Sequence, residues 1–235
     1  MGACGAAAAV LAACGSEGPP GDANLIAGKQ MFVQKCGSCH VLNRAGTTGR
    51  QGPSLDAAFS RSLADGFGRS AIRGVVHSQI LNPANLDPDS PAYMPADLVT
   101  GKGAQDVAAY VASVVGRGGE DTGLLASAVK PAGSGKPVAA KAGVLALPAD
   151  PNGQLAYISE KATAEAGELE LTSENESSVP HNIALEGGGV EEIGEVVQGG
   201  GVSRITVAVD AGEYQFFCTV QGHREGGMEG TLTVK

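Results

Sequence analysis

The chain has 235 residues, is 43% hydrophobic and carries a formal net charge of −9. This acidic balance argues against a nucleic-acid partner, and the hydrophobic content argues against a disordered chain. The length allows two domains, each with its own core. Residues 24–117 hold 9 basic and 6 acidic side chains, whereas residues 141–235 hold 5 and 15. The two halves therefore have opposite net charges, which would let them attract each other or face different partners.

The amino-terminal segment, residues 1–23, begins with an apolar run of small side chains from position 2 to position 14, which ends before Ser16-Glu17-Gly18-Pro19-Pro20. A bilayer span needs about 20 residues, so this shorter run is typical of an export signal. Leu11-Ala12-Ala13-Cys14-Gly15 resembles the lipobox of bacterial lipoproteins, which implies a lipid on Cys14, although no Lys or Arg precedes the run. The alternatives are an Ala-rich helix and a plain secretory signal. We expect an export signal, a lipobox and a short spacer in residues 1–23.

The strongest local motif is Cys36-Gly37-Ser38-Cys39-His40. A Cys-x-x-Cys-His run supplies two thiols that add to the vinyl groups of a haem and a histidine that binds the iron. A thioredoxin-like redox pair or half of a zinc site would also use Cys-x-x-Cys. Neither is favoured, because the sequence has no second Cys pair and no βαβ pattern surrounds the motif.

Helical periodicity flanks this motif. Apolar and small residues at helical spacing predict a helix from about Asn24 into the motif and another that ends just before Gly116. A third helix is predicted over Ser70–Leu81. We expect the first two to pack on each other, with Gly28 allowing a close approach.

The second axial ligand of the haem is expected to be Met94, in a loop between these helices. The chain between His40 and Met94 is long enough to wrap around the macrocycle and return from its opposite face. Thioether sulfur favours Fe(II) and raises the reduction potential. Met31 is too near Cys36 to cross the haem plane, and His77, on the predicted third helix, is the rival ligand.

Residues 24–117 resemble a monohaem class I cytochrome c. The resemblance implies a mainly α-helical fold, one covalent haem c on Cys36 and Cys39, and axial ligation by His40 and Met94. It also implies export, since bacteria attach haem c outside the cytoplasmic membrane. Residues 118–140, rich in Gly and Pro, are predicted to be a flexible linker with a short helical turn at Leu124 to Val129.

In residues 141–235 the spacing of apolar residues changes from the helical period to a period of two. Alternating apolar and polar residues punctuated by Gly, Asn and Pro predict a small antiparallel β-sandwich, with strands that include Glu168–Leu171, Ile205–Val209 and Thr231–Val234.

The chemistry of this half lies near its carboxyl end, where a single loop after Cys218 contains both His223 and Met228. One thiolate, one imidazole and one thioether are three parts of a copper site with two His, one Cys and a weak axial Met. His181 supplies the second imidazole. The alternatives are a structural cysteine with unrelated histidines and a tetrahedral zinc site.

This half resembles the cupredoxins, the blue-copper proteins such as plastocyanin, auracyanin and halocyanin. The resemblance implies an all-β Greek-key sandwich in residues 141–235 and one type 1 copper held by His181, Cys218, His223 and Met228. It also suggests the edge of His223 as the electron port. A lone Cys218 argues against the binuclear centre of oxidase subunit II, which needs two bridging thiolates.

Together these features predict an exported electron carrier, not an enzyme. We expect a monomer that passes single electrons between haem, copper and external redox proteins or membrane complexes of a respiratory or photosynthetic chain. Its expected location is the periplasm or the outer face of the cytoplasmic membrane, with an anchor at Cys14. One alternative, a relative of nitrite reductase, needs a second copper, and His77 is the only histidine without a role. Another is a copper-binding or copper-sensing lipoprotein.

Overall fold

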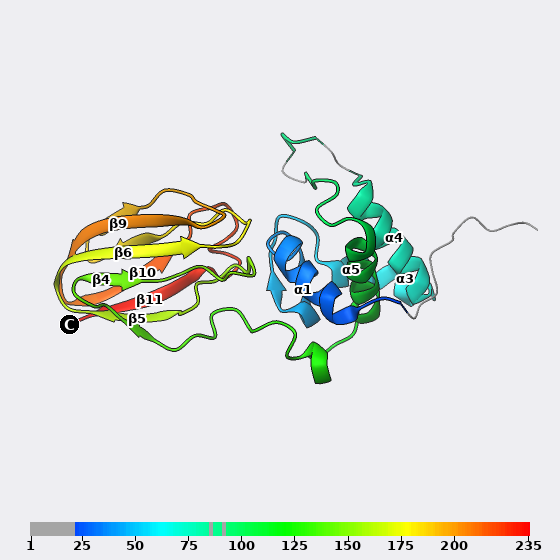
Figure 1. Cartoon of the computed structure of the whole chain (residues 1–235), viewed down its shortest axis with the longest axis horizontal. Coiled ribbons are helices and arrows are strands. Elements are labelled where there is room, and N and C mark those ends of the chain that lie inside the picture. Colours follow the sequence, from blue (N-terminus) through cyan, green and yellow to red (C-terminus); the bar gives the residue numbers. More distant parts are fainter. Residues whose placement is uncertain (1–21, 85–86, 91–92) are drawn as a thin grey trace, which may run out of the picture.

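A computed structural model describes residues 22–84, 87–90 and 93–235 and divides them into a helical part and a β part (Figure 1). The helical part contains α1 (Leu25–Lys35), α2 (Leu55–Ala58), α3 (Ser60–Ala64), α4 (Arg69–Leu81) and α5 (Gly101–Val114), with the short strands β1 (Val41–Leu42) and β2 (Thr47–Thr48) and the 3₁₀ turn η1 (Asn43–Ala45). The expected class is confirmed: mainly α, then all β. None of the helices in these ranges is long and apolar enough to cross a membrane.

The core of the first domain forms where α1 and α4 pack on α5. Asn24 caps α1, because its side chain accepts the amide hydrogens of Ile26 and Ala27. The expected close approach at Gly28 is confirmed, since a Cβ on this residue would overlap the carbonyl of Asp106 on α5. Helix α4 matches the helix predicted over Ser70–Leu81 to within one residue. These contacts set the direction in which α1 delivers Cys36.

The β part is a two-layer sandwich. One sheet has the order β3-β5-β11-β10-β7-β8 and the other the order β4-β6-β9. The strands are β3 (Val138–Ala139), β4 (Val144–Ala146), β5 (Lys161–Ala164), β6 (Gly167–Asn175), β7 (Ala184–Gly187), β8 (Val190–Ile193), β9 (Gly201–Val209), β10 (Gly212–Phe217) and β11 (Glu229–Val234). Their inward faces bury a continuous apolar core between the sheets.

The predicted antiparallel arrangement is wrong for part of this sandwich. Strand β4 pairs with β6 in parallel, and β5 pairs in parallel with both β11 and β3. An alternating pattern of side chains fixes which face of a strand is buried, but that pattern is the same for either strand direction. His181, expected to open a strand, lies in an isolated bridge with Val197, and β7 begins at Ala184.

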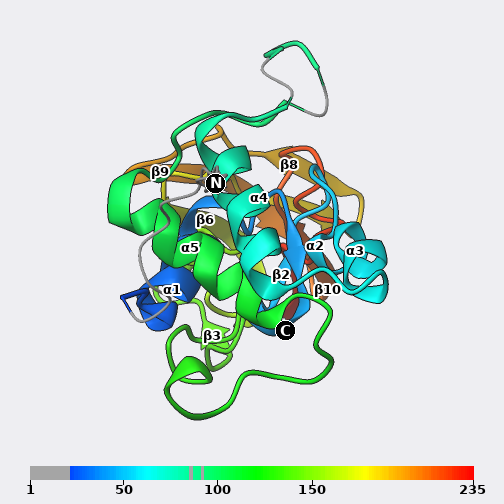
Figure 2. The same cartoon turned by 90° about the vertical axis from the view of Figure 1, so that its right-hand side faces the viewer.

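The segment predicted as a flexible linker is hydrogen-bonded along most of its length. It contains a 3₁₀ turn η2 (Gly123–Leu125), close to the helical turn expected there, and ends in β3, which belongs to the larger sheet. Figure 2, viewed along the long axis of the molecule, shows part of this segment as a loop at the edge of the molecule. The β part therefore begins at Val138, a few residues before the predicted boundary at residue 141.

Candidate haem and copper sites

The Cys-x-x-Cys-His motif continues α1 as a tight turn. Cys36 is the C-terminal cap of the helix, and its carbonyl accepts the amide hydrogens of Cys39 and His40 at 3.1 and 2.9 Å. This turn brings the two thiols and the imidazole to one side of the chain, where all three line the same cavity. Burial and the neighbouring Cys39 raise the pKa of the Cys36 thiol to about 12.

The ring of His40 is oriented by the residues that follow it. Its Nδ1 lies 2.9 Å from the carbonyl oxygen of Pro53, which accepts a hydrogen bond when Nδ1 carries the proton. That tautomer leaves the lone pair of Nε2 free for a metal. A Cβ at position 52 would overlap the ring, so Gly52 permits this placement. The pair Gly52-Pro53 thus positions the candidate proximal ligand.

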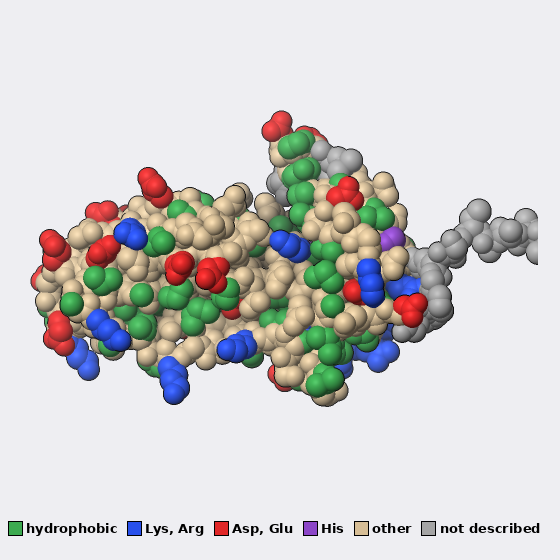
Figure 3. Space-filling view, viewed as in Figure 1, with side chains coloured by type: hydrophobic (Ala, Val, Ile, Leu, Met, Phe, Trp, Pro, Cys, Tyr) green, Lys and Arg blue, Asp and Glu red, His purple; other side chains and the backbone are tan. Residues whose placement is uncertain are grey.

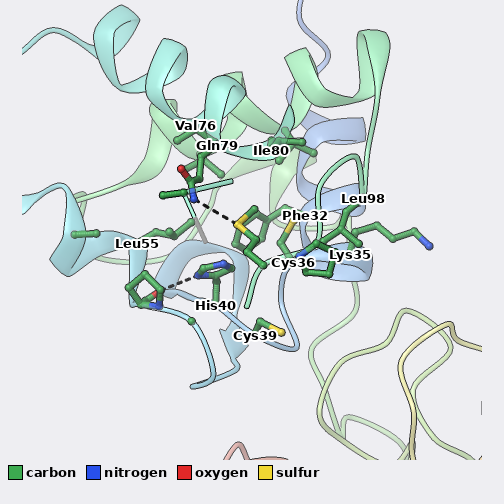
Figure 4. Close-up of a pocket in the computed structure, with 18 of the residues that line it drawn as sticks. Phe32, Lys35, Cys36, Cys39, His40, Leu55, Val76, Gln79, Ile80 and Leu98 are labelled. Carbon is green, nitrogen blue, oxygen red and sulfur yellow. Dashed lines mark hydrogen bonds between the residues drawn. The ribbon is translucent and has the colours of Figure 1, made fainter. Parts of the chain in front are cut away.

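The cavity has a volume of about 420 Å³ and a largely apolar lining drawn from α1, α2, α4 and α5 (Figure 4). Its apolar lining includes Phe32, Leu55, Phe59, Val76, Ile80, Leu98, Val107 and Val111. An apolar cavity that presents two thiols, a free imidazole nitrogen and a thioether suits a haem, whose macrocycle is apolar and whose iron takes nitrogen and sulfur ligands. The residues present therefore fit a covalent haem c.

Met94 lies on the wall of this cavity, as axial ligation requires. Its Sδ is 3.9 Å from Nε2 of Gln79, a contact drawn as a dashed line in Figure 4. His77 belongs to the same helix as Gln79 but is not among the lining residues, whereas its neighbour Val76 is. Met31 packs instead beside Gly103. The geometry favours Met94 over both rivals, and its ligation of iron stays a prediction.

Replacing Met94 by alanine should abolish the weak sulfur-to-iron absorption of the oxidised protein and lower the haem potential. We expect a fall of roughly 0.2 V, since axial ligands tune haem potentials over about 0.8 V. Visible spectra and a potentiometric titration measure both effects. Met31→Ala removes a methionine outside the cavity lining and should leave both unchanged. An unaltered spectrum in Met94→Ala would point to His77 or another ligand.

The candidate copper ligands converge at one end of the sandwich. Nδ1 of His223 lies 3.2 Å from Nδ1 of His181 and 3.5 Å from Sγ of Cys218, and the three ligand atoms are all within 4.8 Å of one another. All three residues are buried. Met228, also fully buried, is tied to the group through its backbone, because its carbonyl accepts from the Cys218 amide at 3.1 Å and its amide donates to His223 at 2.9 Å.

These donors suit copper. A thiol and two imidazole nitrogens surround one point, and the thioether of Met228 belongs to the same buried loop, which is the donor set of a His₂Cys site with a weak axial Met. Cys218 follows the last residue of β10, and Met228 precedes β11, so two paired strands hold both ends of the loop. A loop fixed at both ends keeps its ligands in place when the metal changes oxidation state.

Asn182, which the sequence analysis did not single out, fastens this loop to the segment that carries His181. Its side chain donates to Thr219 Oγ1 and accepts from the Thr219 amide, both at 2.8 Å, and also donates to the carbonyl of Gly194. A buried amide bonded to two other segments holds His181 beside Cys218. Its position next to a ligand was the only signal in the sequence.

Arg224 braces the other side of the loop. It donates to Glu186 on β7 at 2.7 Å and to Glu229 on β11 at 3.0 Å, and its guanidinium lies 4.0 Å over the ring of Phe217. Arg224 directly follows His223, so these contacts restrain that ligand. The restraint comes from three neighbouring strands, since Glu186, Phe217 and Glu229 lie on β7, β10 and β11.

The protonation states of the copper site follow from its burial. Desolvation, helped by His223, lowers the pKa of His181 to about 3, and desolvation lowers the pKa of His223 to about 4. Burial raises the pKa of the Cys218 thiol, although hydrogen bonds from the backbone amides of Asn182 and Val220 act in the opposite direction. At neutral pH the metal-free site therefore holds two neutral imidazoles and one protonated thiol.

A buried charged cluster in the first domain was also missed. Lys29 Nζ lies 3.0 Å from the carboxylate of Asp121, to which Tyr110 also donates at 2.8 Å, while Nη1 of Arg44 is 3.6 Å away. Burial and Asp121 raise the pKa of Tyr110, so its hydroxyl keeps the proton it donates. Asp121 lies in the Gly-rich segment, where no periodicity marked it as buried. Cys14, the predicted lipid site, lies outside the described residues.

Models of known families match both parts of the chain. The family model "Cytochrome c" matches residues 25–114, and the family model "Copper binding proteins, plastocyanin/azurin family" matches residues 147–235. A cytochrome c from Ulva intestinalis is 32% identical over 84 residues, covering 31% of this chain and 73% of the relative. A cytochrome c from Gossypium barbadense is 29% identical over 90 residues, covering 34% and 78%.

Similar solved structures were found for the β part. An auracyanin from the photosynthetic bacterium Roseiflexus castenholzii has 22% identity and a TM-score of 0.37, covering 41% of this chain and 99% of the auracyanin. An amicyanin variant has 18% identity and a TM-score of 0.32, covering 41% of this chain and 86% of the amicyanin.

Proposed function

We infer that this chain, which belongs to the cytochrome c family and carries a second domain of the plastocyanin/azurin family, exchanges single electrons between its own haem and copper and with outside redox proteins. The chain is an electron-transfer protein with one haem c and one type 1 copper. When bound, these groups supply the one-electron chemistry. The protein residues hold them, orient their ligands and exclude water from them.

The proposed electron exchange between the two centres is supported by the position of both candidate sites within one chain. The copper-ligand end of the sandwich faces the end of α1 that carries Cys36 (Figure 1). Lys35, directly before Cys36, donates to Ser178, three residues before His181, at 3.2 Å. The segment that carries the candidate haem ligands and the segment that carries His181 are therefore in direct contact.

Stopped-flow reduction tests this exchange. The oxidised holoprotein is mixed with less than one equivalent of a one-electron donor, and the haem and blue-copper absorptions are followed separately. We expect one absorption to change at the expense of the other in a first-order phase whose rate is independent of protein concentration. Reduced fractions that stay fixed after mixing would contradict the proposal. In Cys218→Ser this phase should be missing while the haem is still reduced.

The reductase alternative has little support from the ligands. The chain has four histidines, and His40, His181 and His223 belong to the two candidate centres, which leaves His77 on α4 for a second copper. A single imidazole does not provide enough ligands for a catalytic copper site. We therefore propose an electron carrier. Nitrite consumption by the reduced holoprotein, measured against a cytochrome control, would contradict this assignment.

We further propose that the protein is exported and anchored through a lipid on Cys14, at the outer face of the cytoplasmic membrane, as a monomer. Support comes from the apolar run before Cys14 and from the haem attachment motif. Its partners would be redox proteins or membrane complexes of a respiratory or photosynthetic chain. Cys14→Ala should release the protein from membranes, and continued pelleting would contradict the anchor.

A further inference from the structure

The two domains meet in a seam at the copper-ligand end of the sandwich. Besides the bond from Lys35 to Ser178, which lies at the surface, the last turn of α1 comes within van der Waals range of Gly153. A Cβ on this residue would lie 3.5 Å from the carbonyl oxygen of Gln34 and 2.9 Å from Cγ2 of Val179. The last turn of α1 therefore fits against two loops of the second domain, one of which leads to His181.

Two residues at this seam are buried outside the two hydrophobic cores. Val179 is only 9% exposed, yet it belongs to neither of the two core clusters. Gln154, beside Gly153, is likewise buried, with its side chain bonded to Lys130 and Asp150. Val179 packs beside Gly153, in the loop that meets the last turn of α1, two residues before a candidate copper ligand.

A second set of contacts comes from residues 118–136, which we call the strap. On the side of the first domain, Arg44 donates to Gly118, Lys29 to Leu125 and Gln30 to Ala128, at 2.9, 2.8 and 3.1 Å. On the side of the second domain, contact begins with the bond from Gln154 to the carbonyl of Lys130 at 3.0 Å. Only position 129 lies between Ala128 and Lys130.

The strap then continues on the second domain. Gly135 donates to Ile158 at 2.8 Å, and Ser159 donates to the carbonyl of Lys136 at 2.7 Å. Position 129 is itself partly buried, since Val129 packs against the core of the first domain. The strap therefore has no unbound stretch between its contacts with the first domain and its contacts with the second. It cannot act as a flexible linker that lets the domains move apart.

Charge acts in the same direction over longer distances. The first domain has three more basic than acidic side chains, and the second has ten more acidic than basic. On the face drawn in Figure 3, acidic side chains are spread over the second domain. Two haem propionates would reduce the excess of the first domain to about +1, so the attraction between the domains is weak and is greatest at low ionic strength.

We propose that the seam and the strap hold the two domains in one lasting docked arrangement, in which the copper-ligand end of the sandwich is occupied by the haem domain of the same chain. That end is then closed to outside proteins, which must reach the chain through its haem domain. The docked arrangement stands on contacts alone; the statement about outside partners rests on the proposed function.

The docked arrangement is tested by ¹⁵N relaxation of the fully reduced holoprotein, in which low-spin Fe(II) and Cu(I) are both diamagnetic. Rotational correlation times are obtained separately for the two domains. We expect one common value in the wild-type chain, because a single body tumbles as a unit. Two clearly different values in the wild-type chain would overturn the proposal.

Two matched variants separate the seam from the strap. Both carry a six-residue Gly-Ser insertion after Val129, which frees the strap. One adds Ser178→Arg, which places a bulky cation opposite Lys35 in the seam, and the other adds Ala211→Arg in the exposed turn at the opposite end of the sandwich. We expect the Ser178 variant to lose the common value, with correlation times shortened about twofold as each domain tumbles alone.

The Ala211 variant should keep the common value, because its seam is intact. If the two domains have different correlation times in both variants, the seam does not hold the domains together, and the part of the proposal that concerns the seam is refuted. Stopped-flow exchange on the same proteins separates this inference from the proposed function. Different correlation times in the wild type, with exchange still present, would refute only the docking. A common correlation time without exchange would refute only the proposed function.

Discussion

Copper-loaded Cys218→Ser should lack the intense visible absorption of the wild-type protein entirely. This absorption arises from charge transfer between a thiolate and Cu(II), and within the described part of the chain Cys218 is the thiol that lies beside the two imidazoles. A serine oxygen in the same place is harder and does not replace it. Visible spectroscopy after copper titration measures the change. The haem bands serve as an internal control, since Cys36 and Cys39 are unaltered.

A proton count adds a second measurement to this variant. The lowered pKa values of His181 and His223, about 3 and about 4, mean that neither imidazole carries a proton to release at pH 7. The raised pKa of Cys218 means that its thiol does. Copper binding to the wild-type chain should therefore release about one proton, and to Cys218→Ser about none. A blue band that persists in the variant would refute this copper site.

Asp121→Ala should destabilise the first domain by about 3–5 kcal/mol, the usual cost of removing one partner of a buried ion pair. The Asp121 side chain is 2% exposed, and its loss would leave the Lys29 ammonium buried with only the Leu125 carbonyl 2.8 Å away. Tyr110 would lose its acceptor as well. Denaturant unfolding of the holoprotein, followed by helical circular dichroism, measures the free energy.

Asp65→Ala is the matched control. It removes a carboxylate paired with Arg61 at 2.9 Å, but both side chains are largely exposed, and such pairs contribute about 0.3–0.5 kcal/mol. If the Asp121 and Asp65 variants lost similar amounts of stability, the buried cluster would not be what fixes the start of the strap. The seam alone would then hold the two domains together.

Sites defined by short sequence spacing were the most predictable part of this molecule. Cys36 to His40 lie within one helical turn, and Cys218 to Met228 lie within one loop, so local spacing implies spatial proximity. Met94 and His181 were harder, because each joins its site from a distant segment. They were selected because few other methionines and histidines exist in the chain.

Two other features that depend on tertiary contact were not predictable. The parallel pairing of β4 with β6 leaves the same alternation as an antiparallel pair. The order of the strap depends on side chains of Lys29, Gln30 and Arg44, which are distant in the sequence from their backbone acceptors. A Gly-rich composition indicates a flexible segment only when no other part of the chain supplies such donors.

The cluster of Lys29 and Asp121 also determines where the first domain can be cut and when it can finish folding. The helices end at Val114, but a fragment that stopped at residue 117 would leave a buried lysine without its carboxylate. A stable isolated fragment should therefore extend to about residue 129. For the same reason, a chain emerging from its amino end cannot complete this domain until residues 121–125 have followed, well after the haem-binding turn has formed.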